Sequence, residues 1–129
     1  MRTPKPWLAA LILTGLALAS GATYGRAAAA STTIKGYVID SACTFTKHLK
    51  KPISADCAVA CAKAGSPLVI QTEEGMIYWP ISSDTPAAGQ NDKLMSYSGK
   101  MVSVTGTVYT KGGSRAIVIS KVEAADSSK

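Results

Sequence analysis

The chain has 129 residues and a formal net charge of +6 at pH 7. Three basic residues, Arg2, Lys5 and Arg26, lie within the first thirty positions; without them, eleven Lys and Arg residues stand against eight Asp and Glu residues. The remaining net charge, near +3, is too small to indicate a protein that binds nucleic acid. About one hundred residues are enough for a single domain with a small core.

The N-terminus has the three parts of a secretory signal peptide. Arg2 and Lys5 come first, an apolar run covers residues 7–19, and small residues continue to Ala30. The run has about 13 residues, whereas a membrane-spanning helix needs roughly 20. We therefore expect residues 1–30 to be a removed signal peptide without a permanent membrane anchor. The rest of the chain is then periplasmic or secreted, where a nucleic-acid partner is not expected.

Five segments beyond the signal peptide have the alternating or β-branched pattern typical of strands. They are residues 33–40, 67–72, 76–82, 100–110 and 116–122. Glu73-Glu74-Gly75 predicts a hairpin turn between the second and third strands, and Gly112-Gly113 predicts one between the fourth and fifth.

Two short helices are expected between these strands. The first covers residues 55–64, with Ser54 as its N-cap and Gly65 at its end. The second covers residues 92–98, with Asn91 as its cap. Both predictions depend on capping residues as much as on the apolar pattern.

The order of elements predicts a mainly β fold, a five-stranded OB-like antiparallel barrel. One helix is inserted after strand 1, and a short helix lies between strands 3 and 4. Gly36 and Gly106, each inside a strand, suit the bulges that a small barrel needs. The domain is expected over residues 31–123, followed by a polar tail at 124–129. An antiparallel sandwich or an open sheet is the alternative.

Two stretches of the sequence are similar to known proteins. Residues 99–123 resemble the last two strands of bacterial periplasmic OB-fold proteins. A longer stretch, from GYVIDSAC through DCAVACAKAG, resembles a group of small secreted bacterial proteins with the pattern Asp-Ser-x-Cys, a nearby His and Cys-x-x-x-Cys. The matching positions are Asp40, Ser41, Cys43, His48, Cys57, Cys61 and Gly65. The resemblance implies the fold and the location, and no activity.

Three cysteines and the only histidine fall within nineteen positions, as Cys43, His48, Cys57 and Cys61. Cys57 and Cys61 are four residues apart on the predicted helix and so share one face. The loop over residues 42–54 can fold back and bring the other two to the same place. Three cysteines and a histidine are a standard ligand set for zinc, and thiolates with an imidazole also suit copper(I).

A disulfide is the main alternative use of these cysteines. Small secreted domains commonly use disulfides as cross-links, so Cys43 paired with Cys57 or Cys61 would leave one spare thiol. Redox exchange is less well supported, because the spacing is Cys-x-x-x-Cys and not Cys-x-x-Cys. Cys57 in the first turn of its helix, with lysines at 47, 50 and 51, also predicts a low thiol pKa.

The remaining polar and aromatic residues give weaker signals. Asp40 is expected to cap the turn after the first strand, because no second carboxylate lies near it in sequence. Trp79 and Tyr78 alternate on the third strand, so that one of them faces outward. An exposed aromatic can stack a sugar or a base, but one aromatic does not make a binding platform.

The sequence therefore predicts an exported, non-enzymatic protein that binds zinc or copper(I) through Cys43, His48, Cys57 and Cys61. Its partner is the metal ion or another protein. No Ser-His-Asp set, paired carboxylates or phosphate loop suggests an enzyme. The alternative is an extracytoplasmic OB binding module for a protein or an oligosaccharide, cross-linked by one disulfide.

Overall fold

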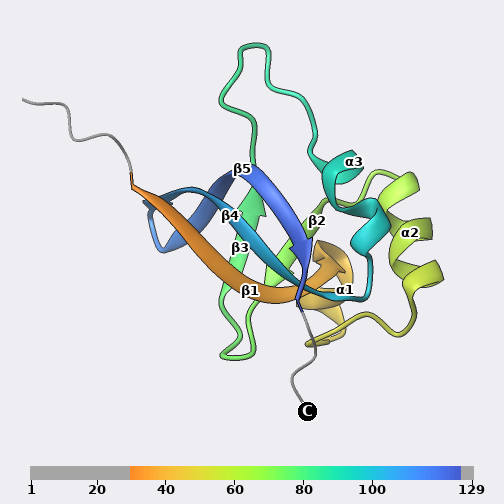
Figure 1. Cartoon of the computed structure of the whole chain (residues 1–129). Helices are drawn as coiled ribbons and strands as arrows, with labels where there is room; N and C mark the ends of the chain where they lie inside the picture. The colour runs from red at the N-terminus through yellow and green to blue at the C-terminus, as the bar shows by residue number, and fades with distance from the viewer. Residues whose placement is uncertain (1–29, 126–129) are drawn as a thin grey trace, which may run out of the picture.

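The computed structural model describes residues 30–125, which form a closed five-stranded barrel (Figure 1). The predicted signal peptide, up to residue 29, and residues 126–129 of the predicted tail lie outside the described residues. The strands are β1 (Ser31–Asp40), β2 (Leu68–Gln71), β3 (Ile77–Pro80), β4 (Met101–Lys111) and β5 (Ser114–Ala124). Each matches one of the five segments predicted to be strands, with ends shifted by at most two residues; β5 includes Ala124, where the tail was expected to begin.

The order of strands around the barrel is β1-β2-β3-β5-β4, and β4 closes it against β1. All neighbouring pairs are antiparallel except β3 and β5, which run parallel, with Trp79 opposite Ala116. The prediction of an antiparallel barrel was therefore wrong at one pair. The reason is geometric: five is an odd number, so strand directions cannot alternate all the way around a closed barrel. The OB assignment stays a prediction.

The two hairpin turns form where the glycine-containing turns predict them. Gly112 and Gly113, with φ of 55° and 81°, connect β4 to β5 in a turn that residues with side chains rarely adopt. Gly75, with φ of 86°, lies in the turn between β2 and β3, where its amide donates to the carbonyl of Thr72. Both turns lie at the same end of the β3–β5 pair, because these strands are parallel and the turns precede them.

The core fills the inside of the barrel with alternate residues of every strand. Its buried members are Ile34, Val38, Ala62, Leu68, Ile70, Tyr78, Leu94, Val102, Val104, Ile117 and Ile119. Gly36 and Gly106 belong to the same inward rows, and at both positions a Cβ atom would collide with the backbone of the neighbouring strand. A register shift between Thr105 and Gly106 marks the bulge expected there.

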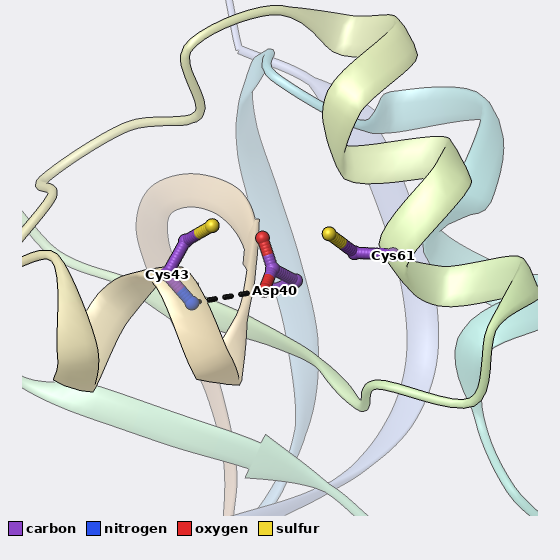
Figure 2. A group of neighbouring side chains, drawn as sticks. All are labelled: Asp40, Cys43 and Cys61. Atoms are coloured by element: carbon purple, nitrogen blue, oxygen red, sulfur yellow. Dashed lines mark hydrogen bonds between the residues drawn. The ribbon is translucent and has the colours of Figure 1, made fainter.

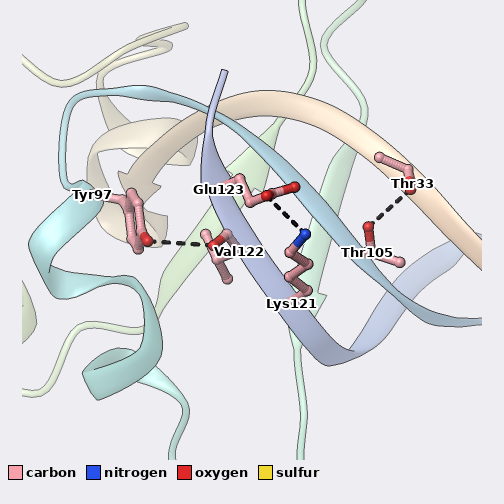
Figure 3. A network of polar contacts seen from close by, with 6 residues as sticks. All are labelled: Thr33, Tyr97, Thr105, Lys121, Val122 and Glu123. Atoms are coloured by element: carbon pink, nitrogen blue, oxygen red, sulfur yellow. Dashed lines mark hydrogen bonds and ion pairs between the residues drawn. The ribbon is translucent and has the colours of Figure 1, made fainter. Parts of the chain in front are cut away.

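Polar contacts between neighbouring elements reinforce the β1–β4–β5 side of the barrel (Figure 3). The hydroxyls of Thr33 and Thr105 are 2.9 Å apart across β1 and β4. The Tyr97 hydroxyl donates to the carbonyl of Val122 over 3.3 Å and attaches the turn before β4 to β5. The third contact in this view, the 2.8 Å ion pair of Lys121 and Glu123, lies within β5, is exposed and contributes little stability.

The helices gather at one end of the barrel (Figure 1). They are α1 (Ser41–Thr46), α2 (Ala55–Lys63), α3 (Asn91–Leu94) and the 3-10 turn η1 (Met95–Tyr97). Helix α2 lies where a helix was predicted, whereas α1 occupies part of what was predicted to be a loop. Among the described residues, no helix has the length and apolar content needed to span a membrane.

Asn91 has a different role from the predicted helix cap. Gln90 occupies the N-cap position of α3 and makes no side-chain capping bond. The Asn91 amide instead donates to the carbonyls of Ala62 and Ser66, at 3.2 and 2.9 Å, and its oxygen accepts from the Leu68 amide at 2.8 Å. One side chain thus links the end of α2, the start of β2 and α3.

Candidate metal centre

Asp40 is the last residue of β1 and the N-cap of α1. Side chains alternate along the strand, so Asp40 continues the inward row of Gly36 and Val38 at the end of the barrel, where it is only 1% exposed. Its Oδ1 accepts from the Cys43 amide at 2.9 Å. The capping role predicted for Asp40 is confirmed, and the cap starts the short helix that carries Cys43.

Helix α2 brings the other two cysteines to the same end of the barrel. Ser54 caps it as predicted, its Oγ accepting from the Cys57 amide at 3.1 Å. Gly65, with φ of 100°, follows its end. Ala58 and Ala62 are buried and fix the face of α2 that packs on the barrel. Cys61, between these alanines in the sequence, is half-buried.

The ligand atoms of three side chains converge where β1, α1 and α2 meet. A carboxylate oxygen of Asp40 and the Sγ atoms of Cys43 and Cys61 all lie within 4.8 Å of one another. Figure 2 shows the Asp40 carboxylate between the two cysteine side chains. Two thiols and a carboxylate in this arrangement form a group able to hold a metal ion.

Comparison with protein-family models, with curated proteins and with solved structures finds no match. The resemblance to small secreted bacterial proteins therefore stays a prediction. What can be concluded about the site comes from its own geometry.

The structure brings together two of the four residues predicted as ligands, Cys43 and Cys61. Cys57 lies one helical turn before Cys61 on the same side of α2, outside the group of atoms that lie within 4.8 Å of one another. His48 also lies outside this group, exposed after α1 with φ of 53°. Asp40 replaces it as the third member.

The thiols of this cluster hold their protons more firmly than ordinary cysteines. The pKa of Cys43 is raised from 9.0 to about 11, first by a hydrogen bond with the Asp40 carboxylate and then by burial. The pKa of Cys61 is raised by burial first and by the Asp40 charge second. The low thiol pKa predicted from the sequence concerned Cys57, whereas the two thiols of this cluster have raised pKa values because burial and the nearby Asp40 carboxylate disfavour the thiolate.

No disulfide joins the cysteines, all three of which belong to the described residues. The contribution of Asp40 could have been predicted from one signal. An Asp at the end of a strand, directly followed by Ser-x-Cys, caps a helix whose third residue is that cysteine, so carboxylate and thiol must be neighbours.

Proposed function

We propose that this protein binds a thiophilic metal ion through the Sγ atoms of Cys43 and Cys61 and a carboxylate oxygen of Asp40. The observation that supports this is the convergence of the three ligand atoms from three different elements. Ligands at about 2.0–2.3 Å from a tetrahedral ion lie roughly 3.3–3.8 Å from each other. Movements of about 1 Å bring the three atoms to that spacing, which rotation of the side chains supplies.

The carboxylate favours zinc over copper(I) as the ion. Thiolates suit both metals, but a carboxylate oxygen is a hard donor that zinc accepts readily and copper(I) does not. Asp40 retains Oδ1 for its capping bond and has its second oxygen left for the ion. The capping bond then orients the carboxylate, as outer hydrogen bonds do at many metal sites.

Cys57 is the proposed fourth ligand. It lies four residues before Cys61 on the same helix face, where side chains are about 5–6 Å apart at their Cβ atoms. A rotation of the Cys57 side chain toward Cys61 completes a set of three sulfurs and one oxygen. His48 is an exposed loop residue and is not needed for this set.

A closed set of four protein ligands suits a structural or a metal-carrying role, because hydrolytic catalysis needs an open coordination position. The ion would fasten α1 and α2 to the end of β1. Such a link adds stability to a domain whose core is small.

The proposal is tested by titrating the reduced, metal-free protein with zinc and, separately, with copper(I), using competing chelators of known affinity. We expect one zinc ion per chain. Cys43→Ser, Cys61→Ser and Asp40→Asn should each weaken zinc binding by about tenfold or more. His48→Ala is the matched control and should bind zinc as the unaltered protein does. Equal zinc affinities for all these variants, or a preference of the unaltered protein for copper(I) over zinc, would contradict the assignment.

A further inference from the structure

Trp79 lines two pockets on the outside of the barrel, and neither is lined by Asp40, Cys43 or Cys61. One, of about 480 Å³, lies between the turns at Gly75 and Gly112-Gly113 and includes Phe45 and Arg115. The other, of about 660 Å³, lies beside the loop that leads into α3. Trp79 lines both, so the two pockets lie on either side of one aromatic side chain.

The aromatic wall consists of two residues from distant parts of the sequence. Phe45, on α1, stacks on Trp79 with ring centroids 6.1 Å apart and planes inclined by 18°. Phe45 is 55% exposed although it is a large apolar side chain. Trp79 is half-buried, so the exposed aromatic surface of this stacked pair belongs mainly to Phe45, and both rings line the first pocket.

The first pocket also carries one charge of each sign. Arg115 and Glu74 both line it, from β5 and from the turn before β3. A hydrogen bond from Thr72 lowers the pKa of Glu74, so this side chain is a carboxylate at neutral pH. A polyanion such as a nucleic acid would meet that carboxylate as well as the single arginine. Paired charges of opposite sign suit hydroxyl groups, which both donate and accept.

The second pocket has apolar walls and a polar end. Pro67, Pro80 and Ile81 contribute apolar surface, while Gln90 and Asp92 contribute polar groups. The Gln90 amide nitrogen donates to the carbonyls of Ala88 and Gly89, at 2.8 and 3.3 Å, which fixes the side chain. Its buried Oε1 has no hydrogen-bond partner within the described part of the chain.

We propose that the two pockets form one groove that binds a neutral oligosaccharide, with a sugar ring against the Trp79 and Phe45 pair and its neighbours in the flanking pockets. A pyranose has an apolar C–H face for an aromatic surface and a rim of hydroxyls for Arg115, Glu74 and Asp92. Two pockets that share one wall fit several linked rings better than a single small molecule. The groove contains none of the proposed metal ligands, so the sugar contacts are separate from the metal contacts.

Isothermal titration calorimetry of the full chain with cellohexaose, maltohexaose and chitohexaose tests this proposal. At least one hexasaccharide should bind at millimolar or lower concentration. Trp79→Ala should weaken that binding roughly tenfold or more, as the loss of one stacking aromatic does for other ring-shaped ligands. Trp79→Phe should retain most of it, because a flat ring remains.

Tyr109→Ala is the matched control. Ala116 on β5 is paired with Trp79 on β3 at one side and with Tyr109 on β4 at the other, so both aromatic side chains are on the outer face of the barrel. Tyr109 is 49% exposed. It lines neither pocket, and its removal should leave binding unchanged. If circular dichroism shows that Trp79→Ala does not fold, Phe45→Ala and Arg115→Ala replace it. Each should lower the affinity for the sugar severalfold. Failure of all three sugars to bind, equal binding by Trp79→Ala and Tyr109→Ala, or binding of single-stranded oligodeoxythymidine in place of the sugars would overturn the proposal.

Discussion

Asp40 combines two roles that each require a carboxylate at the end of a strand. One oxygen accepts from the Cys43 amide and begins α1, and the side chain as a whole raises the pKa of the Cys43 thiol. In the metal-free protein, the Asp40 carboxylate beside Cys43 disfavours ionisation of the thiol. The same carboxylate is the negatively charged ligand that lies next to the Cys43 sulfur. A divalent cation reverses this balance, because it favours both the carboxylate and the thiolate.

The raised pKa predicts how the stability of the metal-free protein depends on pH. The folded-state pKa of Cys43, about 11, lies above the ordinary value of 9.0, so the folded protein holds this proton longer than the unfolded chain. The resulting stabilisation is complete below pH 9 and is lost as the pH rises toward 11. Urea unfolding across this range should show the free energy of unfolding falling more steeply for the unaltered protein than for Cys43→Ser.

Asp40→Asn provides the control for that pH dependence. Asparagine can still cap α1 but has no charge, so the pKa of Cys43 should return toward 9.0 and the difference from Cys43→Ser should shrink. An unchanged slope in Asp40→Asn would show that the carboxylate is not the cause. Zinc affinity should rise with pH over the same range, because binding displaces the thiol protons.

The sequence predicts the two cysteines of the cluster but not the whole site. Cys43 and Cys61 stand out because cysteines are few and close together. Asp40 was interpreted only as a cap, since no other carboxylate lies near it in sequence and proximity to Cys61 depends on how α2 packs. His48 is near the cysteines in sequence, but its loop position leaves it exposed and outside the group of converging ligand atoms.

At the level of elements, α2 is positioned by contacts at both of its ends. Ser54 caps its first turn, and Asn91 holds the carbonyl of Ala62 near its last turn. Because Cys61 lies in this last turn, the position of its sulfur depends on a residue that is thirty positions away in the sequence.

Asn91→Ala should therefore destabilise the fold and weaken the metal site together. It removes three hydrogen bonds and leaves the buried amide of Leu68 without a partner, at a cost of about 2 kcal/mol. Lys93→Ala, an exposed change in the same helix, should alter the free energy of unfolding by less than about 0.5 kcal/mol. Equal effects of the two variants in urea unfolding would contradict this role of Asn91.

The strands could be predicted from the sequence more completely than helix α1 and its contacts with the barrel. The strands follow from alternation and from glycine turns, which are local signals. Helix α1 has only six residues, too few to show a periodic pattern, so it was predicted as a loop. The stacking of Phe45 on Trp79 depends on that helix, which carries Phe45. The aromatic residues of the third strand alone gave no reason to expect a stacked pair of rings.

On the scale of the whole molecule, closure of the barrel requires close approach of β4 and β5. A Cβ atom at Gly106 would lie closer to the Val118 carbonyl oxygen than real Cβ atoms do. Gly106→Ala should thus cost about 3 kcal/mol or more. Gly89→Ala has open space around the new methyl group and should change stability by less than about 0.5 kcal/mol. Thermal unfolding compares the two, and similar midpoints would show that the barrel is not tightly closed here.

The central claim, that the end of β1, α1 and α2 meet around one metal ion, is tested most directly by X-ray absorption at the zinc edge on the protein loaded with one equivalent of zinc. We predict sulfur ligands at about 2.3 Å and a carboxylate oxygen at about 2.0–2.2 Å. The same spectrum is expected for His48→Ala, with fewer sulfurs for Cys43→Ser and Cys61→Ser. A shell of nitrogen and oxygen alone, scattering from an imidazole, or loss of the zinc during desalting would contradict the account.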